Sequence, residues 1–515
     1  MLITDVPEFS ARARPEDPAL VFEDRTWSAR QFAGDVSRLR AGLAALIAPG
    51  DRIAVVSENR PEMAMSLYSG IPTMFGNARL APSELADLLA DVEPTVLVGS
   101  ADQLERLSGL HRRFESVHTA VCLDDRGGDV GISALMASGR GAAAAAGIGV
   151  PDPGDTAWII HTSGTTGTPK GAVITHRSLL AAVANTAIAR PAAPDDVYYF
   201  PFPLFHVAAY NVVHHHLRRR PVVLARKFDA AAALATIEAE RVTSASMAPT
   251  MISMLLDHPA RPDHDLSSLR QLAYGASAIP LSTLRRGMTE LGCGFAQGYG
   301  MTELSGNAVF LDPDAHRLAA SSAPHLLAAA GVPAPMVSIR IVDESFADCA
   351  IDEPGEILVH GDQVIPRYWN QPDTTAAAFV DGWFRTGDIG RIDDLGFLYV
   401  VDRLKDIIVT GGENVSSREV EDVISTHPDV AGVAVIGIPH DRWGEQIVAV
   451  VVPRNERVDP AALIRHCEEH LAGFKKPKLI LSIDELPVNA SGKVLKTELR
   501  QWASARAGIE ELPGN

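Results

Sequence analysis

The sequence predicts an α/β protein with at least two domains. Short apolar stretches, such as residues 53–56, 96–98 and 222–225, are bounded by Gly, Pro or charged residues, and helix-like segments rich in Ala, Leu and Arg separate them. This alternation is typical of α/β layers. The chain has 515 residues. Because a single hydrophobic core stops growing at roughly 250–300 residues, we expect more than one domain.

Composition and charge exclude several classes of protein. With 46% hydrophobic and 21% charged residues, the chain resembles an ordinary globular protein rather than a disordered one. Its formal net charge of -18 disfavours nucleic acid as the main partner, because a phosphate backbone requires clustered Lys and Arg. The four cysteines are far apart and form no CxxC pair, which argues against a zinc or disulfide framework and favours the cytoplasm. No apolar run reaches 18 residues and no signal-peptide pattern is present, so we expect no transmembrane segment.

Two segments mark the domain organisation. Residues 138–154 combine a Gly- and Ala-rich run with Pro-Asp-Pro-Gly, which predicts a surface connector between two lobes of one large domain. The strand-like residues 396–401 are followed by a charged stretch, residues 402–406, before the apolar residues 407–409 resume. We therefore predict an N-terminal domain over residues 1–402, a hinge over residues 403–405 and a C-terminal domain over residues 406–515.

The residues after this boundary have the pattern of a small α/β domain. A helix is predicted over residues 417–426 and a second over residues 460–471. Between them lie two strand-like segments, residues 432–437 and 447–452.

The strongest local signal is a loop rich in Gly and Thr, residues 162–171, which follows an apolar strand at residues 157–160. Hydroxyl groups and backbone N–H groups can surround a polyphosphate, while Lys170 supplies positive charge. The candidate phosphate-binding residues are Thr162, Ser163, Gly164, Thr165, Thr166 and Lys170. Pro169 precedes the lysine and Gly171 leads into a strand, so the loop differs from the phosphate loop of kinases and GTPases.

This loop resembles the signature of the adenylate-forming superfamily, which includes acyl-CoA synthetases, luciferases and nonribosomal adenylation domains. Other segments resemble motifs of that superfamily in the same order, namely residues 298–303, 386–388, 402–406 and 487–493. The resemblance is closest to the acyl-CoA synthetases. It implies a large N-terminal domain of sheets sandwiched by helices, with subdomains, and a small mobile C-terminal α/β domain.

The second motif supplies candidates for adenine, phosphate and metal binding. Tyr299 lies between two glycines, so the backbone can turn closely around a ligand while the ring offers a stacking face for adenine. Thr302 can donate to a phosphate oxygen, and Glu303 is a hard oxygen ligand suited to Mg²⁺. The segment containing Gly275 and Ala276 resembles the adenine-side loop of the superfamily.

The third and fourth motifs predict the sugar site and the hinge. Asp388 follows a Thr-Gly turn, where its carboxylate can accept hydrogen bonds from both hydroxyls of a ribose. Arg403 can complete the sugar and phosphate contacts as a donor. By its place two residues after Arg403, Lys405 is the predicted hinge residue.

The C-terminal motif predicts the catalytic lysine. Lys493 lies in a loop that can deliver an ammonium to a site formed by another domain, where neutralising and aligning two anions is the main catalytic task. By resemblance, Gly411 and Gly412 face the pantetheine arm of coenzyme A.

Two further features concern the acid. By resemblance His206 lies beside the acyl carboxylate; a half-buried structural histidine is the alternative. No Asp follows Phe205, which argues against an amino-acid substrate. Three histidines and three arginines occur in residues 214–220, and we expect a solvated helix end there rather than a site for an anionic acid.

The resemblance implies an ATP-dependent carboxylic acid:CoA ligase, an acyl-CoA synthetase of the AMP-forming type. It would form an acyl-adenylate with release of pyrophosphate and then an acyl-CoA thioester, with ATP, Mg²⁺ and coenzyme A as cofactors. Fatty acid metabolism is one expected setting, and the enzyme is expected to be a monomer or homodimer. The alternatives are transfer to a carrier-protein phosphopantetheine or another nucleophile, and a catalytically silent nucleotide-binding protein.

Overall fold

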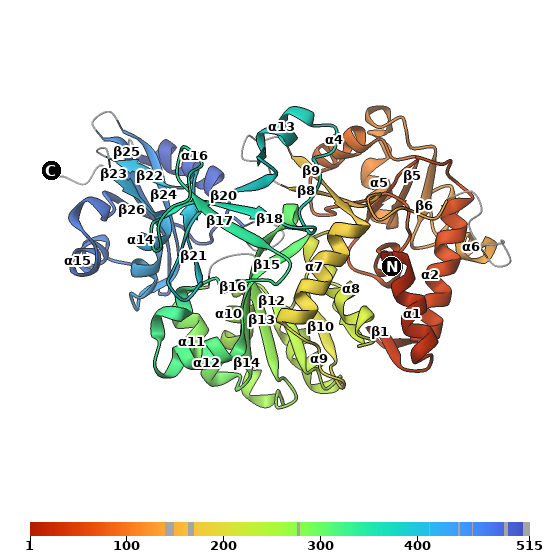
Figure 1. The fold of residues 1–515 in the computed structure, drawn as a ribbon, viewed down its shortest axis with the longest axis horizontal. Helices are drawn as coiled ribbons and strands as arrows, with labels where there is room; N and C mark the ends of the chain where they lie inside the picture. Colours follow the sequence, from red (N-terminus) through yellow and green to blue (C-terminus); the bar gives the residue numbers. More distant parts are fainter. Residues whose placement is uncertain are drawn as a thin grey trace.

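The computed structural model describes residues 1–139, 149–162, 169–275, 279–410, 413–440, 443–455, 457–488 and 493–507. Within these residues the strands form four sheets, and helices cover them (Figure 1). The predicted α/β class is therefore confirmed. In the described part of the chain, every helix is too short or too polar to cross a membrane.

The largest sheet is parallel at its centre and antiparallel at both edges. Its strand order is β16-β15-β14-β13-β12-β10-β11-β1-β2. The strands are β1 Pro18–Phe22, β2 Arg25–Ser28, β10 Tyr198–Phe200, β11 Val222–Leu224, β12 Ser244–Met247, β13 Gln271–Gly275, β14 Gly294–Met301, β15 Gly306–Leu311 and β16 Val332–Pro333.

The second sheet has the order β7-β6-β5-β3-β4-β8-β9, and only its last pair is antiparallel among the described strands. Its strands are β3 Ile53–Val56, β4 Thr73–Gly76, β5 Val96–Gly99, β6 Thr119–Cys122, β7 Val130–Gly131, β8 Thr156–Thr162 and β9 Lys170–Thr175. Every residue of β3 and β5 is buried, which explains why these strands read as continuous apolar runs rather than as alternating patterns.

One apolar core joins the two large sheets. Trp158 and Ile160 of β8 belong to the same buried cluster as Tyr198 and Phe200 of β10, so the two sheets share a single core. The helices of this part are α1 Val6–Ala13, α2 Ala29–Ala44, α3 Pro61–Ser66, α4 Pro82–Val92, α5 Ala101–Ser108, α6 Ile132–Ser138, α7 His176–Ala189, α8 Tyr210–Leu217, α9 Ala230–Ala239, α10 Pro249–Asp257, α11 Leu281–Glu290, α12 Pro313–Ser321 and α13 Pro372–Ala377. Most of the predicted connector between the lobes, residues 140–148, lies outside the described residues.

A third, antiparallel sheet lies between these layers and the C-terminal domain (Figure 1). Its strands are β17 Ser338–Val342, β18 Gly355–His360, β19 Phe379–Val380, β20 Trp383–Ile392 and β21 Leu398–Arg403. The predicted strand at residues 396–401 is therefore shifted: β21 includes Asp402 and Arg403, because both pair with β20.

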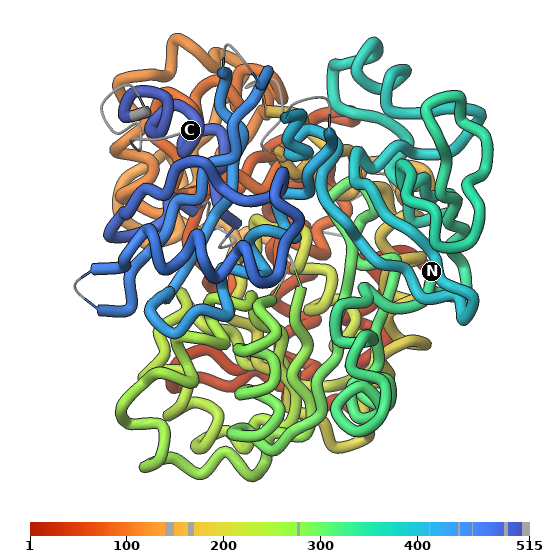
Figure 2. Tube along the Cα trace, turned by 90° about the vertical axis from the view of Figure 1, so that its left-hand side faces the viewer, coloured from red at the N-terminus to blue at the C-terminus, as the bar shows by residue number. Residues whose placement is uncertain are grey.

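The C-terminal domain contains the predicted helices and strands. The helices are α14 Ser417–Ser425, α15 Pro460–His470 and α16 Lys496–Ala507, and the strands are β22 Ile408–Thr410, β23 Glu413–Val415, β24 Val430–His440, β25 Gly444–Pro453 and β26 Leu479–Ser482. Figure 2 shows this domain, in blue, in front of the N-terminal domain.

The helices of the C-terminal domain cover two opposite faces of its sheet. Alternate residues of β25 point to opposite faces. Ile447 and Ala449 belong to a core with Leu463 of α15, whereas Val448 and Val450 belong to a core with Leu499 of α16. Lys493 lies in the segment that precedes α16.

Candidate active site

The predicted phosphate loop connects two paired strands. Thr162 at the end of β8 lies opposite Lys170 at the start of β9 in an antiparallel pair. The prediction that Gly171 leads into a strand is confirmed, and β9 begins one residue earlier, at Lys170. Four of the candidate phosphate ligands, Ser163, Gly164, Thr165 and Thr166, lie outside the described residues. Because Thr162 and Lys170 are paired, the two ends of the loop nevertheless lie next to each other in the sheet.

Glu303 faces this hairpin from the other large sheet. It lies with Thr302 in a short 3-10 helix, Thr302–Leu304, between β14 and β15. Its carboxylate accepts a hydrogen bond from the Tyr368 hydroxyl at 3.0 Å and a longer one from the Thr162 hydroxyl at 3.4 Å. Lys170 Nζ lies 5.3 Å from the centroid of the Tyr368 ring. The first and second motifs, far apart in sequence, therefore meet.

The donor set around Glu303 fits a magnesium ion shared with phosphates. A carboxylate beside a threonine hydroxyl offers hard oxygen atoms, which Mg²⁺ prefers. Mg²⁺ commonly binds through one or two carboxylates together with substrate phosphates rather than in a complete protein cage. One acidic side chain at the edge of a phosphate loop is sufficient for that arrangement.

Asp388 forms the centre of a second group of site residues. It lies opposite Arg403 across the β20–β21 pair, with 2.8 Å between its Oδ1 and Arg403 Nε. The Tyr299 hydroxyl donates to Asp388 Oδ2 at 2.8 Å. Burial raises the pKa of Asp388, whereas the Arg403 guanidinium acts to lower it. The buried carboxylate is thus held by one hydrogen bond from Tyr299 and by the ion pair with Arg403, and ribose binding there stays a prediction.

Tyr299 and the nearby glycines make structural contacts that the sequence did not predict. Adenine stacking on Tyr299 stays a prediction, and its hydroxyl contacts Asp388. Gly275 of β13 pairs with Gly298 of β14, and a Cβ at Gly275 would lie 2.5 Å from the Gly298 carbonyl oxygen. Only glycine fits this close approach of two strands. Ala276 lies outside the described residues.

Lys493 of the C-terminal domain lies near enough to the Asp388–Arg403 pair for their charges to interact. Its ammonium attracts the Asp388 carboxylate and is repelled by the Arg403 guanidinium. Burial and Arg403 together lower the pKa of Lys493 to about 8. Residues of the third and last motifs therefore lie close enough to influence one another's charge, and the roles predicted for them stay predictions.

We expect the adenylation rate to fall as the pH rises through about 8, the pKa to which Lys493 is lowered. Below that pH the side chain carries the positive charge that two approaching anions require, and above it the charge is lost. Isotope exchange between pyrophosphate and ATP across a pH series measures this step without a thiol. Lys493→Arg is the control, because a guanidinium stays charged over this range; an alkaline limb that is identical in this variant would contradict the assignment.

The comparisons with known proteins decide the family. The sequence model of the AMP-binding enzyme family matches residues 8–369, and that of the AMP-binding enzyme C-terminal domain matches residues 419–493. The chain belongs to the AMP-binding enzyme family. The resemblance to the adenylate-forming superfamily, near the acyl-CoA synthetases, is thereby confirmed.

Relatives of this AMP-binding enzyme match along nearly its whole length. It is 35% identical to a feruloyl-CoA synthase from Amycolatopsis sp, over 96% of this chain and 98% of the relative. The solved o-succinylbenzoate CoA synthetase from Bacillus subtilis, in complex with its acyl-adenylate intermediate, has a TM-score of 0.84 and 30% identity over 96% of this chain and 98% of its own. An amide bond synthetase from Marinactinospora thermotolerans has a TM-score of 0.87 and 28% identity over 97% and 99%.

In this AMP-binding enzyme, side chains near the predicted hinge tie the two domains together. The Asp402 carboxylate accepts from the Ser417 backbone N–H at 2.6 Å and from the Ser417 hydroxyl at 2.9 Å. It thereby satisfies donors at the N-terminus of α14. Lys405 is exposed in the turn that follows, where Asp406 N–H donates to the Arg403 carbonyl at 2.8 Å. The predicted CoA-facing residues Gly411 and Gly412 lie outside the described residues.

Lys496 anchors the segment that carries Lys493. Its ammonium lies 2.7 Å from Glu421 Oε1 and donates to the Ser417 hydroxyl at 2.6 Å. Both partners lie in α14, so the start of α16 is fixed to the helix that follows the hinge. No local pattern in the sequence reveals Lys496, Glu421 and Tyr368, because their partners lie tens of residues away in sequence.

His206 is half-buried, and its contacts resemble those of a structural histidine. Its Nδ1 accepts a hydrogen bond from Ala208 N–H at 3.2 Å, which caps the 3-10 helix Val207–Ala209 before α8. Its ring stacks against Phe202, with centroids 6.3 Å apart. Burial lowers the pKa of His206 to about 4, so the ring is neutral near pH 7. A role beside the acyl carboxylate stays a prediction.

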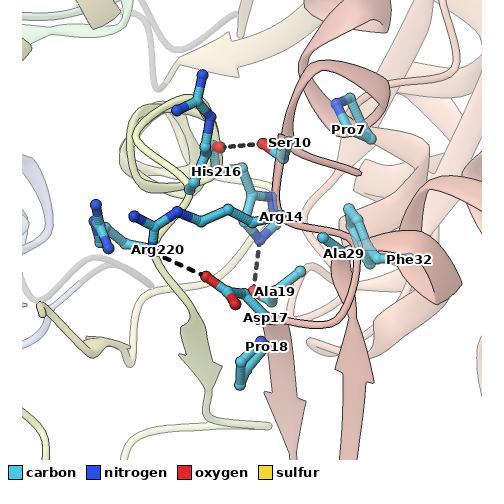
Figure 3. Close-up of a pocket in the computed structure, with 11 residues that line it drawn as sticks. Pro7, Ser10, Arg14, Asp17, Pro18, Ala19, Ala29, Phe32, His216 and Arg220 are labelled. Carbon is cyan, nitrogen blue, oxygen red and sulfur yellow. Dashed lines mark hydrogen bonds and ion pairs between the residues drawn. The ribbon is translucent and has the colours of Figure 1, made fainter. Parts of the chain in front are cut away.

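The expectation of a solvated helix end at residues 214–220 is wrong for the three histidines, because all three are buried. His215 stacks on Tyr198, with centroids 3.6 Å apart. The His216 ring bonds the Tyr68 hydroxyl at 2.6 Å and the Ala19 carbonyl at 2.9 Å. Figure 3 shows His216 beside Ser10 of α1, whose hydroxyl donates to the His216 carbonyl at 2.6 Å. His216 therefore connects α8 to the N-terminal elements, and His215 packs α8 against β10.

Proposed function

We propose that the protein is an ATP-dependent carboxylic acid:CoA ligase that works through an acyl-adenylate. The observation that supports this proposal is that the charge of Lys493, from the C-terminal domain, acts on the Asp388–Arg403 ion pair of the strands β20 and β21. A ribose held at Asp388 would place the α-phosphate of ATP within the influence of this lysine. The proposal assigns ATP and acid binding to residues 1–402, hinge motion to residues 403–405 and delivery of the lysine to residues 406–515.

In the first step, a carboxylate oxygen of the acid attacks the α-phosphorus of ATP, and the bond to the β-phosphate oxygen breaks as pyrophosphate leaves. Two anions must approach, so this chain's own contribution is alignment and charge neutralisation. Lys493 and Lys170 supply the positive charge, and Asp388 orients the sugar. Glu303 would hold Mg²⁺, which when bound neutralises phosphate charge.

In the second step, a thiol attacks the acyl carbonyl of the adenylate, the bond to the AMP oxygen breaks, and a thioester and AMP form. Coenzyme A is the proposed acceptor, since the feruloyl and o-succinylbenzoate relatives carry CoA in their names. These names also favour an acid that carries a ring. Because the chain is also similar to an amide bond synthetase, another nucleophile such as an amine is the second candidate for the acceptor of the acyl group. A product assay that offers free coenzyme A or an amine separates the two.

We expect pyrophosphate and an acyl-adenylate, rather than orthophosphate and ADP, to form from ATP only when a suitable acid and Mg²⁺ are both present, and free AMP to follow when coenzyme A is added. The physical reason is that attack at the α-phosphorus needs the acid as nucleophile and the metal to offset phosphate charge. A panel of ring-bearing and fatty acids, scored by pyrophosphate release and by mass spectrometry of the nucleotides, is the measurement. Formation of ADP with orthophosphate would contradict adenylation, and no turnover with any acid would favour a silent nucleotide-binding protein.

The cytoplasmic location and the oligomeric state stay predictions. The location rests on the widely spaced cysteines, all four of which carry free thiols in the structure.

A further inference from the structure

A cluster of possible metal ligands lies on α15 of the C-terminal domain. One ligand atom from each of His466, Glu469 and His470 lies within 4.8 Å of the others. The two histidines are four residues apart on a helix, so their side chains share one face. Their ring centroids are 4.7 Å apart. His466 is half-buried, whereas Glu469 and His470 are exposed, so a dissolved ion can reach them.

Backbone carbonyls determine which ring nitrogen of each histidine can bind a metal. His470 Nδ1 lies 2.8 Å from the His466 carbonyl oxygen, and His466 Nε2 lies 3.1 Å from the Val423 carbonyl oxygen. A carbonyl oxygen only accepts, so each of these nitrogens carries a hydrogen in the neutral ring. The lone pairs therefore remain on His470 Nε2 and His466 Nδ1. Metal-binding histidines are typically oriented by this kind of outer hydrogen bond.

Thr426 completes the support of His466. Its hydroxyl donates to the Val423 carbonyl at 2.7 Å, so its oxygen is left to accept from His466 Nε2, which is 2.8 Å away. Val423 belongs to α14 and Thr426 follows it. The orientation of His466 is thus set by α14, although the ligands belong to α15.

We propose that His466, Glu469 and His470 form a binding site for a divalent transition-metal ion of the Zn²⁺ class. Two imidazoles and one carboxylate suit Zn²⁺, Co²⁺, Ni²⁺ or Cu²⁺, whereas Mg²⁺ prefers oxygen ligands. The site is therefore chemically distinct from Glu303. Its helix α15 packs on the sheet face opposite the α16 core. A bound ion stabilises the folded C-terminal domain, because the unfolded chain lacks the assembled site.

The experiment uses the full chain, stripped of metal and free of nucleotide, titrated with Zn²⁺ in a calorimeter. We expect one ion per chain and a higher melting temperature with Zn²⁺. His470→Ala should weaken binding at least about 10-fold, since loss of even an outer partner of a metal ligand commonly costs that much. Glu469→Gln, which keeps the size of the side chain, should also weaken it.

Glu468→Gln is the matched control, because Glu468 lies on the same helix but pairs with Lys476 Nζ at 2.5 Å. Its affinity for Zn²⁺ should equal that of the parent protein. Circular dichroism verifies that each variant is folded. Absence of binding at millimolar Zn²⁺, or equal affinity in the parent and His470→Ala proteins, would overturn the proposal; adenylation activity has no bearing on either result.

Discussion

Lys493→Ala should lose adenylation and keep thioester formation, whereas Lys405→Pro should do the reverse. In the structure the charge of Lys493 acts on Asp388 and Arg403, so in the proposed reaction its removal would take away a positioned charge where the two anions would meet. Loss of one such preorganised group typically costs on the order of 10²–10³-fold in rate. Once the adenylate exists this charge is no longer required, so the variant should still convert a supplied acyl-adenylate and coenzyme A to thioester.

Lys405→Pro tests the hinge. Proline fixes φ near -65°, which should hinder rotation of the C-terminal domain while leaving it in the arrangement that the structure has, with Lys493 at the sugar site. Adenylation should survive, and thioester formation should slow. Lys405→Ala is the matched control, because it removes the same exposed side chain without restricting φ.

Both half-reactions are followed by mass spectrometry for each folded variant. The pattern expected is one defective step per variant, and a different step for each. If Lys493→Ala and Lys405→Pro slow both steps equally, these residues do not divide the work, and rotation about residues 403–405 is the wrong mechanism.

Asp388→Ala should raise the KM for ATP strongly. Each hydrogen bond from a ribose hydroxyl to this carboxylate is charge-assisted and contributes about 1.5–3 kcal/mol, which corresponds to roughly 10- to 100-fold in affinity per bond. The side chain of its partner Arg403 is 33% exposed, so water can solvate the guanidinium in the variant and folding should survive. Pyrophosphate release at varied ATP concentration measures the effect.

Two further variants distinguish the acceptor itself, the Asp388 carboxylate, from the Tyr299 hydroxyl that holds this carboxylate in place. Asp388→Asn keeps the shape of the side chain and removes its charge, so its KM should lie between those of the parent and the alanine variant. Tyr299→Phe removes the hydrogen bond to Asp388 Oδ2 but keeps the carboxylate, so it should have a smaller effect. An unchanged KM in Asp388→Ala would remove Asp388 from the nucleotide site.

The sequence alone determined the α/β class, the helices and strands of the C-terminal domain and the order of the motifs. These features are local: apolar periodicity defines α14 and α15, and turn residues with a lysine define the loop between β8 and β9. A locally predicted element forms in the fold when tertiary packing agrees with it. Here the observed strands 430–440 and 444–453 contain the predicted strands 432–437 and 447–452.

Only the tertiary structure decided which residues meet. Thr162 and Glu303 come together because β8 and β14 belong to two sheets that share one core. The spacing of residues within each motif does not predict this contact. The run at residues 214–220 shows the converse: its polar composition predicts exposure, yet His215 and His216 are buried because Tyr198, Tyr68 and the Ala19 carbonyl offer partners. A polar side chain can be buried when its hydrogen bonds are satisfied, and whether they are depends on segments far away in the chain.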